Sequence, residues 1–325
     1  AITLATEILT DLPVGNICVK INHRVLLDAV FELAGVPAEK FRPICSAVDK
    51  LDKETWEEVS REMVDEKGIS REMAEKIGKF VLNTSKTGNP QELWQRMMDD
   101  KTFGDHAKAN AAMLEMRDLF TYLEAMGSAQ FVSFDMSLAR GLDYYTGLIY
   151  EIVVLDGTTA VGSIAAGGRY DNLVGMFSAS NTQTPCVGIS IGIERVFTIM
   201  EKRAIEKKLM SADIVQCYVA SIGANTLTHR MKIAQRLWKA DISAEYSVKE
   251  NPKLKSQMDD CLARGIPFMA IFGDSEMASG VVKLKDMNAH TETDVKLEDL
   301  VAALTTAGCS TVGEESTKFL DSLRD

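Results

Sequence analysis

Strand-like and helix-like segments alternate between residues 211 and 308, and this alternation constrains the fold more than any other feature of the sequence. In chain order, the segments are strand 214–220, helix 226–240, strand 242–246, helix 252–264, strand 267–272, strand 281–284 and helix 297–305. A helix between two strands favours a parallel crossover connection. We therefore expect a small α/β domain with a mostly parallel core. The polar tail, residues 309–325, is expected to be mobile.

The first 204 residues change character twice. A short amphipathic segment (3–12), a strand (17–21) and a helix (24–34) come first. From about residue 43 to 126 the chain is charged and helical, with opposite charges at helical spacing, which predicts an all-helical insertion. β-rich segments then return, and a helix follows them from residue 192 to about 202. These β-rich segments are 131–135, 147–154 and 187–191.

Composition indicates an ordinary globular protein and gives no direct hint of a nucleic-acid partner. The chain has 36 basic and 47 acidic residues, and phosphate binders usually show a basic face. A local patch around Lys249, Lys253 and Lys255 is one interpretation of that run, and a solvated helix face is the other. No apolar run could cross a bilayer, and the N-terminus lacks the pattern of a signal peptide, so we expect a cytoplasmic protein.

Six scattered cysteines form no CxxC pair and mostly adjoin aliphatic residues, which favours buried, reduced thiols. They are Cys18, Cys45, Cys186, Cys217, Cys261 and Cys309. No histidine lies at ligand spacing from a Cys or Asp, so we expect no structural metal site.

Residues 138–147 are the first of three segments with unusual chemistry. Arg140, Asp143, Tyr144 and Tyr145 stand between glycines and are too polar for a core strand. A ligand site is one interpretation. The other is a strand–turn–strand in which the tyrosines pack and Arg140 pairs with Asp143.

Residues 162–171 form a glycine-rich segment. Small residues allow a backbone to approach a ligand closely, and the pair Gly167–Gly168 would permit φ values that other residues cannot adopt. The spacing fits neither a phosphate-binding P-loop nor GxGxxG, so this segment alone is a weak signal.

Residues 186–195 form a strand that ends in Gly192 and enters a helix. Arg195 falls on the first helical turn, beside the positive end of the helix dipole, where it suits a nucleotide phosphate. An ordinary amphipathic helix with a surface arginine is the alternative.

Taken together and in this order, the three segments resemble the histidyl-tRNA synthetases. Residues 140–147 resemble the histidine-specific signature of that family, and residues 166–171 resemble its following glycine-rich strand. Residues 188–195 look like motif 3 of class II synthetases. The resemblance extends to residues 46–53 and 281–284, and it is to the eukaryotic cytoplasmic branch.

This resemblance implies an α+β fold with a separate C-terminal α/β domain. Residues 1–204 would be part of the antiparallel class II catalytic sheet, with the helical insertion at about 43–126. Residues 205–210 would be a linker, and residues 211–308 would bind the anticodon.

The implied activity is that of an ATP-dependent histidine–tRNA ligase. Histidine would be activated with ATP to histidyl-adenylate, with Mg²⁺ bound mainly to phosphate oxygens, and then transferred to tRNA(His). The full-length protein would be a homodimer.

The resemblance also implies residue roles. Arg140 would hold the histidine carboxylate and the α-phosphate, while Tyr144 and Tyr145 would line the imidazole pocket. The other histidine-binding positions would be Tyr170, Gly167 and Gly168. Arg195, with Gly192 and Glu194, would bind ATP.

The chain departs from the family pattern because motifs 1 and 2 do not appear in it. We expect them upstream of Ala1, which is not an initiator Met, and we expect this chain by itself to be inactive. A catalytically silent synthetase-like regulatory or tRNA-sensing module is an alternative. Arg140, Tyr144, Tyr145 and Arg195 are all intact, which argues against it. A small-molecule α/β enzyme unrelated to tRNA would fit the acidic composition but would not explain residues 138–147.

Overall fold

The computed structural model forms two compact units, Ala1–Lys202 and Arg203–Asp325. The residues that it describes are 1–140, 144–155, 162–177, 183–207 and 214–324. The boundary between the units falls within helix α9 (Ile193–Glu206). The expected linker, residues 205–210, therefore begins inside a helix, and its residues 208–210 lie outside the described part of the chain.

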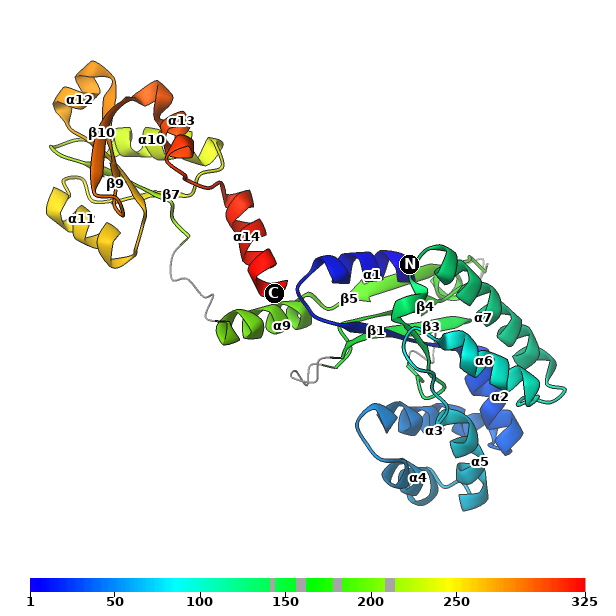
Figure 1. Cartoon of the computed structure of the whole chain (residues 1–325). Coiled ribbons are helices and arrows are strands. Elements are labelled where there is room, and N and C mark those ends of the chain that lie inside the picture. The colour runs from blue at the N-terminus through cyan, green and yellow to red at the C-terminus, as the bar shows by residue number, and fades with distance from the viewer. Residues whose placement is uncertain (141–143, 156–161, 178–182, 208–213, 325) are drawn as a thin grey trace. The chain divides into compact units, whose positions relative to one another are not determined.

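A five-stranded, mostly antiparallel sheet is the centre of the first unit (Figure 1). The strand order is β2-β1-β3-β4-β5, and only β1 and β2 pair in parallel. The strands are β1 (Ile17–His23), β2 (Val132–Phe134), β3 (Leu148–Val154), β4 (Ala165–Arg169) and β5 (Val187–Ile191). This arrangement confirms the expected α+β class with an antiparallel sheet.

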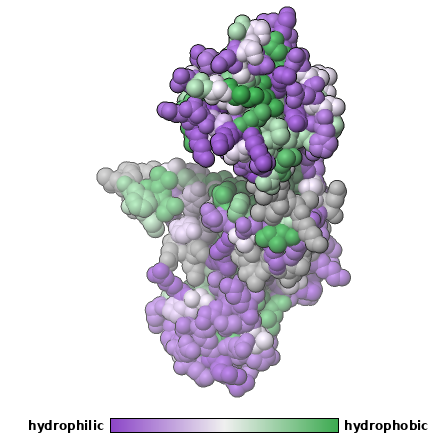
Figure 2. All heavy atoms as spheres, turned by 90° about the vertical axis from the view of Figure 1, so that its left-hand side faces the viewer, coloured by the Kyte–Doolittle hydropathy of each residue, from purple (hydrophilic) through white to green (hydrophobic). Residues whose placement is uncertain are grey.

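Helices cover this sheet and extend away from it. Helices α3, α4 and α5 group together beside the sheet in Figure 1, and their surface in Figure 2 is almost uniformly hydrophilic, as their charged sequence predicts. Their buried residues nevertheless join those of the sheet in one continuous core. The helices are α1 (Ile2–Asp11), α2 (Arg24–Ala34), α3 (Phe41–Val48), α4 (Trp56–Asp65), α5 (Arg71–Val81), α6 (Pro90–Asp99) and α7 (Ala107–Ala125), with short helices η2 (Asp49–Asp52) and α8 (Leu173–Met176).

The second unit contains a mixed five-stranded sheet in the order β10-β9-β8-β6-β7. The parallel pairing predicted from strand–helix alternation is confirmed for β6 with β7 and with β8, whereas β9 and β10 join antiparallel. Four residues between β9 and β10 suffice for a hairpin but not for a crossover. The strands are β6 (Cys217–Ser221), β7 (Ala244–Tyr246), β8 (Phe268–Phe272), β9 (Val281–Asp286) and β10 (Thr291–Lys296).

The C-terminal tail contains a helix that the expectation of a mobile tail did not include. Helix α14 spans Val312–Arg324, and Leu323 on it is fully buried. The other helices of this unit are α10 (Leu227–Lys239), α11 (Leu254–Ala263), α12 (Asp274–Ser279) and α13 (Leu300–Thr306). Among the described residues, no helix combines the length and apolar character needed to cross a bilayer.

The six cysteines are free thiols. Five are buried, as predicted, and Cys186 is half-buried.

A buried histidine joins β1 to α2 and sets the direction in which the chain leaves the sheet. His23 caps α2 because its Nδ1 accepts a hydrogen bond from the Val25 amide at 3.2 Å. Its Nε2 lies 3.3 Å from a carboxylate oxygen of Glu115 on α7. An Nδ1 that accepts leaves the proton on Nε2, so the ring caps the helix in its neutral form. Burial lowers the pKa of His23 below its usual value, although Glu115 opposes the shift.

We predict that His23 makes the first unit less stable in mild acid. The unfolded histidine takes up its proton near pH 6.5 and the folded one only at lower pH, so stability falls as the pH drops below about 6.5, by up to about 1.4 kcal/mol per pH unit. His23→Asn keeps a capping acceptor and removes this titration. Urea unfolding at pH 7.5 and 5.5 measures the difference, and the same pH dependence in the variant and the parent would contradict the prediction.

Candidate functional site

A cavity of about 450 Å³ lies between α3 and the strands β3 and β4, and we call it the tyrosine pocket. Four of the nine residues predicted from the sequence line it, namely Arg140, Tyr144, Tyr145 and Gly167. The remaining lining residues are Arg42, Ser46, Asp49, Leu138, Ala139, Ile149, Tyr150 and Ala166. The helical segment and the sheet therefore both contribute to one cavity.

Glycines on β4 and β5 make room for the tyrosine rings. A Cβ on Gly168 would lie 2.7 Å from Cε1 of Tyr145, and one on Gly167 would lie 2.5 Å from the Tyr150 hydroxyl oxygen. Gly188 stands in the same relation to Tyr170. Neither Gly167 nor Gly168 has a positive φ, so the expectation that they supply unusual backbone angles was wrong. Their role in the free protein is to leave space for the Tyr150 and Tyr145 rings.

The tyrosines of this region form a cluster. The Tyr145 ring centroid lies 4.4 Å from that of Tyr144 and 6.3 Å from that of Tyr170. Burial and the neighbouring Tyr144 raise the pKa of Tyr145, and burial raises the pKa of Tyr150 to about 12. The Tyr150 hydroxyl donates to the Gly188 carbonyl at 2.7 Å. Tyr145 and Tyr150 therefore offer hydroxyl groups that stay protonated at neutral pH.

Arg140 reaches into a group of carboxylates at one end of the tyrosine pocket. Its Nη1 donates to the Ser163 hydroxyl at 2.7 Å and lies 3.2 Å from Glu151 Oε2. The other nitrogens are held less closely, with Nε 3.4 Å from Asp49 Oδ1 and Nη2 3.6 Å from Asp52 Oδ2. Asp143, the alternative partner considered from the sequence, lies outside the described residues.

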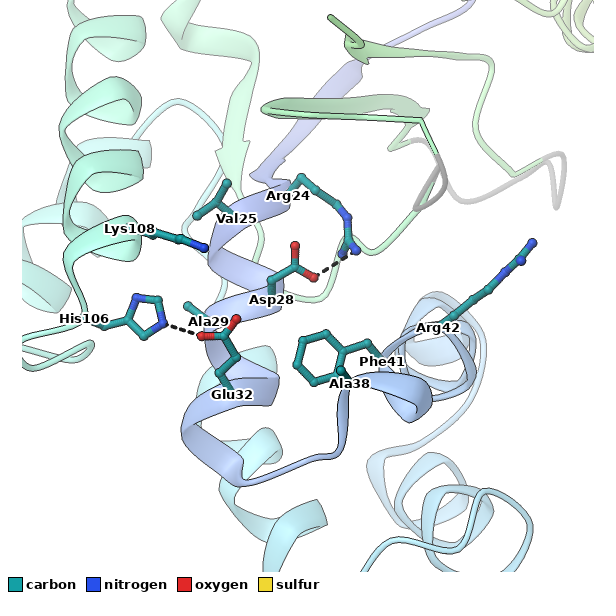
Figure 3. Close-up of a pocket in the computed structure, with 10 residues that line it drawn as sticks. All are labelled: Arg24, Val25, Asp28, Ala29, Glu32, Ala38, Phe41, Arg42, His106 and Lys108. Atoms are coloured by element: carbon teal, nitrogen blue, oxygen red, sulfur yellow. Dashed lines mark hydrogen bonds and ion pairs between the residues drawn. The ribbon is translucent and has the colours of Figure 1, made fainter. Parts of the chain in front are cut away.

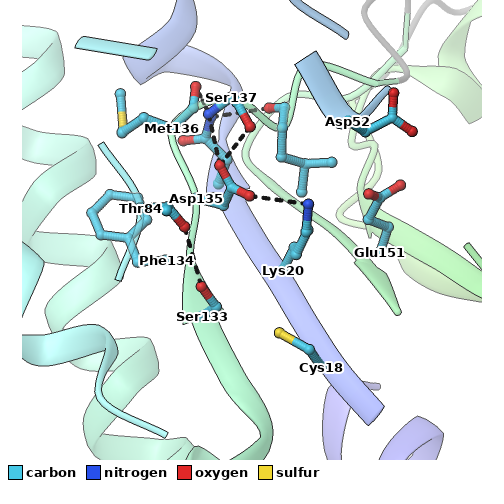
Figure 4. Close-up of polar contacts among 12 residues, drawn as sticks. Cys18, Lys20, Asp52, Thr84, Ser133, Phe134, Asp135, Met136, Ser137 and Glu151 are labelled. Atoms are coloured by element: carbon cyan, nitrogen blue, oxygen red, sulfur yellow. Dashed lines mark hydrogen bonds and ion pairs between the residues drawn. The ribbon is translucent and has the colours of Figure 1, made fainter. Parts of the chain in front are cut away.

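The carboxylates around Arg140 belong to a larger polar network. Lys20 on β1 lies opposite Glu151 in the register of β1 with β3. Its ammonium group lies 3.3 Å from a carboxylate oxygen of Asp135 (Figure 4). Glu151 is 4% exposed, and burial raises its pKa although Arg140 and Lys20 oppose the shift. Burial likewise raises the pKa of Asp49, against the effect of Arg140. Arg140 and Lys20 thus favour the charged form of carboxylates for which burial alone would favour the neutral form.

Arg195 and Arg140 both donate a hydrogen bond to Ser163. Arg195 is exposed on the first turn of α9, and its Nη1 donates to the backbone carbonyl of Ser163. The hydroxyl of the same serine accepts from Arg140. Gly192, just before α9, donates its amide to the Ile164 carbonyl at 2.8 Å, and Glu194 is exposed beside Arg195. The glycine-rich segment and the helix start therefore meet at Ser163.

Comparison with known proteins identifies the family. Residues 1–196 match the profile described as Histidyl-tRNA synthetase, and residues 216–306 match that described as Anticodon binding domain. The chain belongs to the histidyl-tRNA synthetase family.

Individual members of the family match over nearly all of this chain. It is 45% identical to the histidine–tRNA ligase of Danio rerio over 92% of its own length, and 46% identical to the cytoplasmic histidine–tRNA ligase of Dictyostelium discoideum over 91%. These matches span 61% and 60% of the relatives' lengths. Relatives named as mitochondrial match at 42% identity. The crystal structure of histidyl-tRNA synthetase from Nostoc sp. PCC 7120 matches with a TM-score of 0.72 at 26% identity, covering 94% of this chain and 69% of that one.

Several residues of this synthetase-family site have no role assigned from the sequence. Tyr150 and Glu151 are adjacent on β3, and the signal for them was a pair of polar residues in an otherwise aliphatic strand. Asp49 belongs to residues 46–53, where the family resemblance was noted without a role. Ser163 stood within the glycine-rich segment, but nothing in its sequence context predicts contact with both arginines.

A second cavity, of about 480 Å³, lies between α2, α3 and the start of α7 and contains none of the predicted site residues. Its charged groups pair largely with one another, as Figure 3 shows: Arg24 with Asp28 at 2.9 Å, and His106 with Glu32 at 2.9 Å. We therefore place the candidate active site in the tyrosine pocket.

We predict that Gly168→Ala destabilises the first unit whereas Gly192→Ala does not. The added carbon at residue 168 would overlap the Tyr145 ring and the Leu148 carbonyl, at a cost of about 1–3 kcal/mol. At residue 192 the nearest atom would be 3.4 Å away, so the change should stay within about 0.5 kcal/mol. Chemical denaturation measures both, and equal effects would contradict the steric explanation.

Proposed function

We propose that this chain supplies one side of the active site and the anticodon-binding domain of a histidine–tRNA ligase. The observation that supports this most strongly is that Arg140 and Arg195 both donate to Ser163, beside a pocket lined by tyrosines. Because the chain spans 61% of the length of the Danio rerio relative, the activity of the whole enzyme is part of this proposal.

Arg140 is proposed to hold the reacting oxygens during histidine activation. The histidine carboxylate attacks the α-phosphorus of ATP and pyrophosphate leaves, so the protein need supply only position and charge. Close charged hydrogen bonds measure about 2.7–2.9 Å, and Nε and Nη2 of Arg140 lie farther than this from Asp49 and Asp52. That edge of the guanidinium can therefore exchange the aspartates for substrate oxygens, while Nη1 stays on Ser163.

The tyrosines are proposed to select histidine. Tyr144 and Tyr145 line the pocket, and Tyr170 packs beside Tyr145. A phenol that stays protonated can donate to an imidazole nitrogen. A buried polar contact of this kind rejects an analogue without the partner by about 10⁴–10⁵. Gly167 and Gly168 contribute by leaving room for the Tyr150 and Tyr145 rings.

Arg195 is proposed to bind ATP. It projects from the first turn of α9, where the helix dipole favours phosphate, and Glu194 and Gly192 flank it. Among the described residues, no three His, Cys, Asp or Glu side chains are grouped to hold a metal ion. We propose that Mg²⁺ enters with the phosphates of ATP, whose oxygens are its preferred ligands.

The remaining partners follow from membership of the family. The second unit would bind the anticodon of tRNA(His), and the complete enzyme would be a homodimer. We propose the cytoplasm as its compartment, in keeping with the cytoplasmic relative. A silent synthetase-like module is less well supported, because Arg140, Tyr145 and Arg195 are all present at the pocket or beside it.

The test of this function uses a hybrid in which the chain replaces the matching part of the Danio rerio relative. The hybrid should catalyse pyrophosphate exchange that depends on histidine and on no other amino acid, while the 325-residue chain alone should show none. Histidine-independent exchange, or no exchange by a folded hybrid, would count against the proposed function.

In this hybrid, Arg140→Lys should slow exchange by about 10-fold or more, because a lysine keeps the charge but loses the two-pronged grip. The KM for ATP should change much less, since Arg195 is untouched. Arg117→Lys, at an exposed position on α7, is the matched control. Equal losses of ATP affinity and turnover would show that Arg140 acts only on bound ground-state ATP.

The second unit offers a separate prediction about tRNA. Lys249, Lys253 and Lys255 are exposed, and buried Arg230 fixes the loop that contains Lys249 by donating to the carbonyls of Ser247 and Lys249. If these lysines touch phosphates, replacing all three by alanine should weaken tRNA binding. The negative slope of log K against log salt concentration should become less steep, its magnitude falling by about 0.7–0.9 for each lost contact.

Filter binding at several salt concentrations measures this slope, with Lys296→Ala as the control. Histidine-dependent exchange should be unchanged in the triple variant. An unchanged slope would show that the tRNA contacts lie outside this loop.

A further inference from the structure

Ser163 is the residue through which the two arginines of the proposed site are joined. It lies two residues before β4 and is 6% exposed. Its hydroxyl oxygen accepts from Arg140 Nη1 at 2.7 Å, and its carbonyl oxygen accepts from Arg195 Nη1. The two contacts use different atoms of one residue, one from the side chain and one from the backbone.

The backbone beside Ser163 is fixed from both sides. The amide of Ile164 donates to the Ile152 carbonyl of β3 at 2.7 Å, and the carbonyl of Ile164 accepts from the Gly192 amide at 2.8 Å. Ile164 itself is 1% exposed. Ser163 therefore cannot shift without breaking the pairing that links β3, β4 and the start of α9.

The hydrogen bond to Ser163 uses Nη1 of Arg140 and so fixes which nitrogen of the guanidinium faces this residue. Nη1 has its closest contact with the serine hydroxyl and next approaches Glu151, whose Oε2 is otherwise buried without a hydrogen-bond partner among the described residues. Without the hydroxyl, the buried carboxylate of Glu151 and the two aspartates would be the remaining partners of the guanidinium. Each of them could draw it to a different position.

We propose that Ser163 is a positioning residue that fixes Arg140 and Arg195 relative to each other, its hydroxyl orienting the first and its carbonyl the second. This inference rests on the proposed ligase function. It assigns to Ser163 the alignment of the group that stabilises the reacting carboxylate and phosphate with the group that binds ATP. Misplacement of a catalytic group by about 1 Å can cost a factor of about 10² in rate.

The two contacts can be separated experimentally. Ser163→Ala removes the hydroxyl but keeps the carbonyl, so it should release Arg140 and leave Arg195 in place. In the hybrid enzyme, kcat for histidine-dependent exchange should fall about 10- to 100-fold, as expected when one hydrogen bond to a charged group is lost. The KM for ATP should stay within about 2-fold, because the ATP-binding arginine keeps its acceptor.

Two further variants distinguish positioning from a general loss of structure. Ser163→Thr restores the hydroxyl and should recover most of the lost kcat. Ser133→Ala removes another buried hydroxyl of the same sheet, one that donates to the Ser85 carbonyl, and should leave kcat unchanged. An unchanged kcat in Ser163→Ala, a rise in the KM for ATP equal to the fall in kcat, or no recovery with threonine would each overturn the proposal.

A second readout needs no activity and therefore separates this inference from the ligase function. In the 325-residue chain, ¹⁵N NMR of the arginine side chains should give separate Nη signals for Arg140, because the bond from Nη1 to Ser163 slows rotation of the guanidinium. Ser163→Ala should merge these signals and Ser163→Thr should retain them. Signals that do not differ between the parent and Ser163→Ala would overturn the proposal even if the hybrid is active. If the hybrid is inactive but the signals change as expected, the proposed function fails and the positioning of Arg140 stands.

Discussion

The pairing of β3 with β4 is the constraint on which the candidate site depends. This register places Tyr150 opposite Gly167 and Ile149 opposite Gly168, so the rings of Tyr150 and Tyr145 lie where β4 has no side chains. A slip by one residue would send each strand's side chains to the opposite face of the sheet. Because the same pairing fixes the segment that contains Ser163, the pocket and the arginines are set by one stretch of backbone hydrogen bonds.

Charge balance is the second feature that shapes the site. Arg140 approaches three carboxylates, two of them from η2 and one from β3. A single guanidinium cannot neutralise three carboxylates, so the free site has an excess of acid, which Lys20 relieves only in part. In the proposed function, substrate oxygens would displace the loosely held aspartates. Since the aspartates come from the helical segment, substrate binding at Arg140 would then be coupled to the position of η2.

Much of the fold could be predicted from local sequence, because periodicity and end signals are local. The helix 24–34 was predicted with the bounds that α2 has, since Gly35 ends it in the left-handed conformation. Strand β10 was missed because its six residues are almost all polar and exposed, which leaves no alternation to detect. Helix α14 was missed because its tail composition is polar and only Leu323 is fully buried.

The candidate site divides in the same way. Arg140 and the tyrosines came from segments that resemble the histidyl-tRNA synthetases, and Arg195 came from one that resembles motif 3 of class II synthetases in general. Their assigned roles remain predictions. The contacts of Arg140 with Asp49 and Ser163 join residues 91 and 23 positions away along the chain, so no local pattern could reveal them.

The most direct measurement is a crystal structure of the hybrid protein with a sulfamoyl analogue of histidyl-adenylate, in which the sulfamoyl group stands in for the α-phosphate. We expect the imidazole beside Tyr145 and the sulfamoyl oxygens within about 3 Å of Arg140 Nε or Nη2. We also expect Nη1 of Arg140 to remain bonded to the Ser163 hydroxyl. An analogue bound outside the tyrosine pocket, with Arg140 still paired to Asp49 and Asp52, would contradict this prediction.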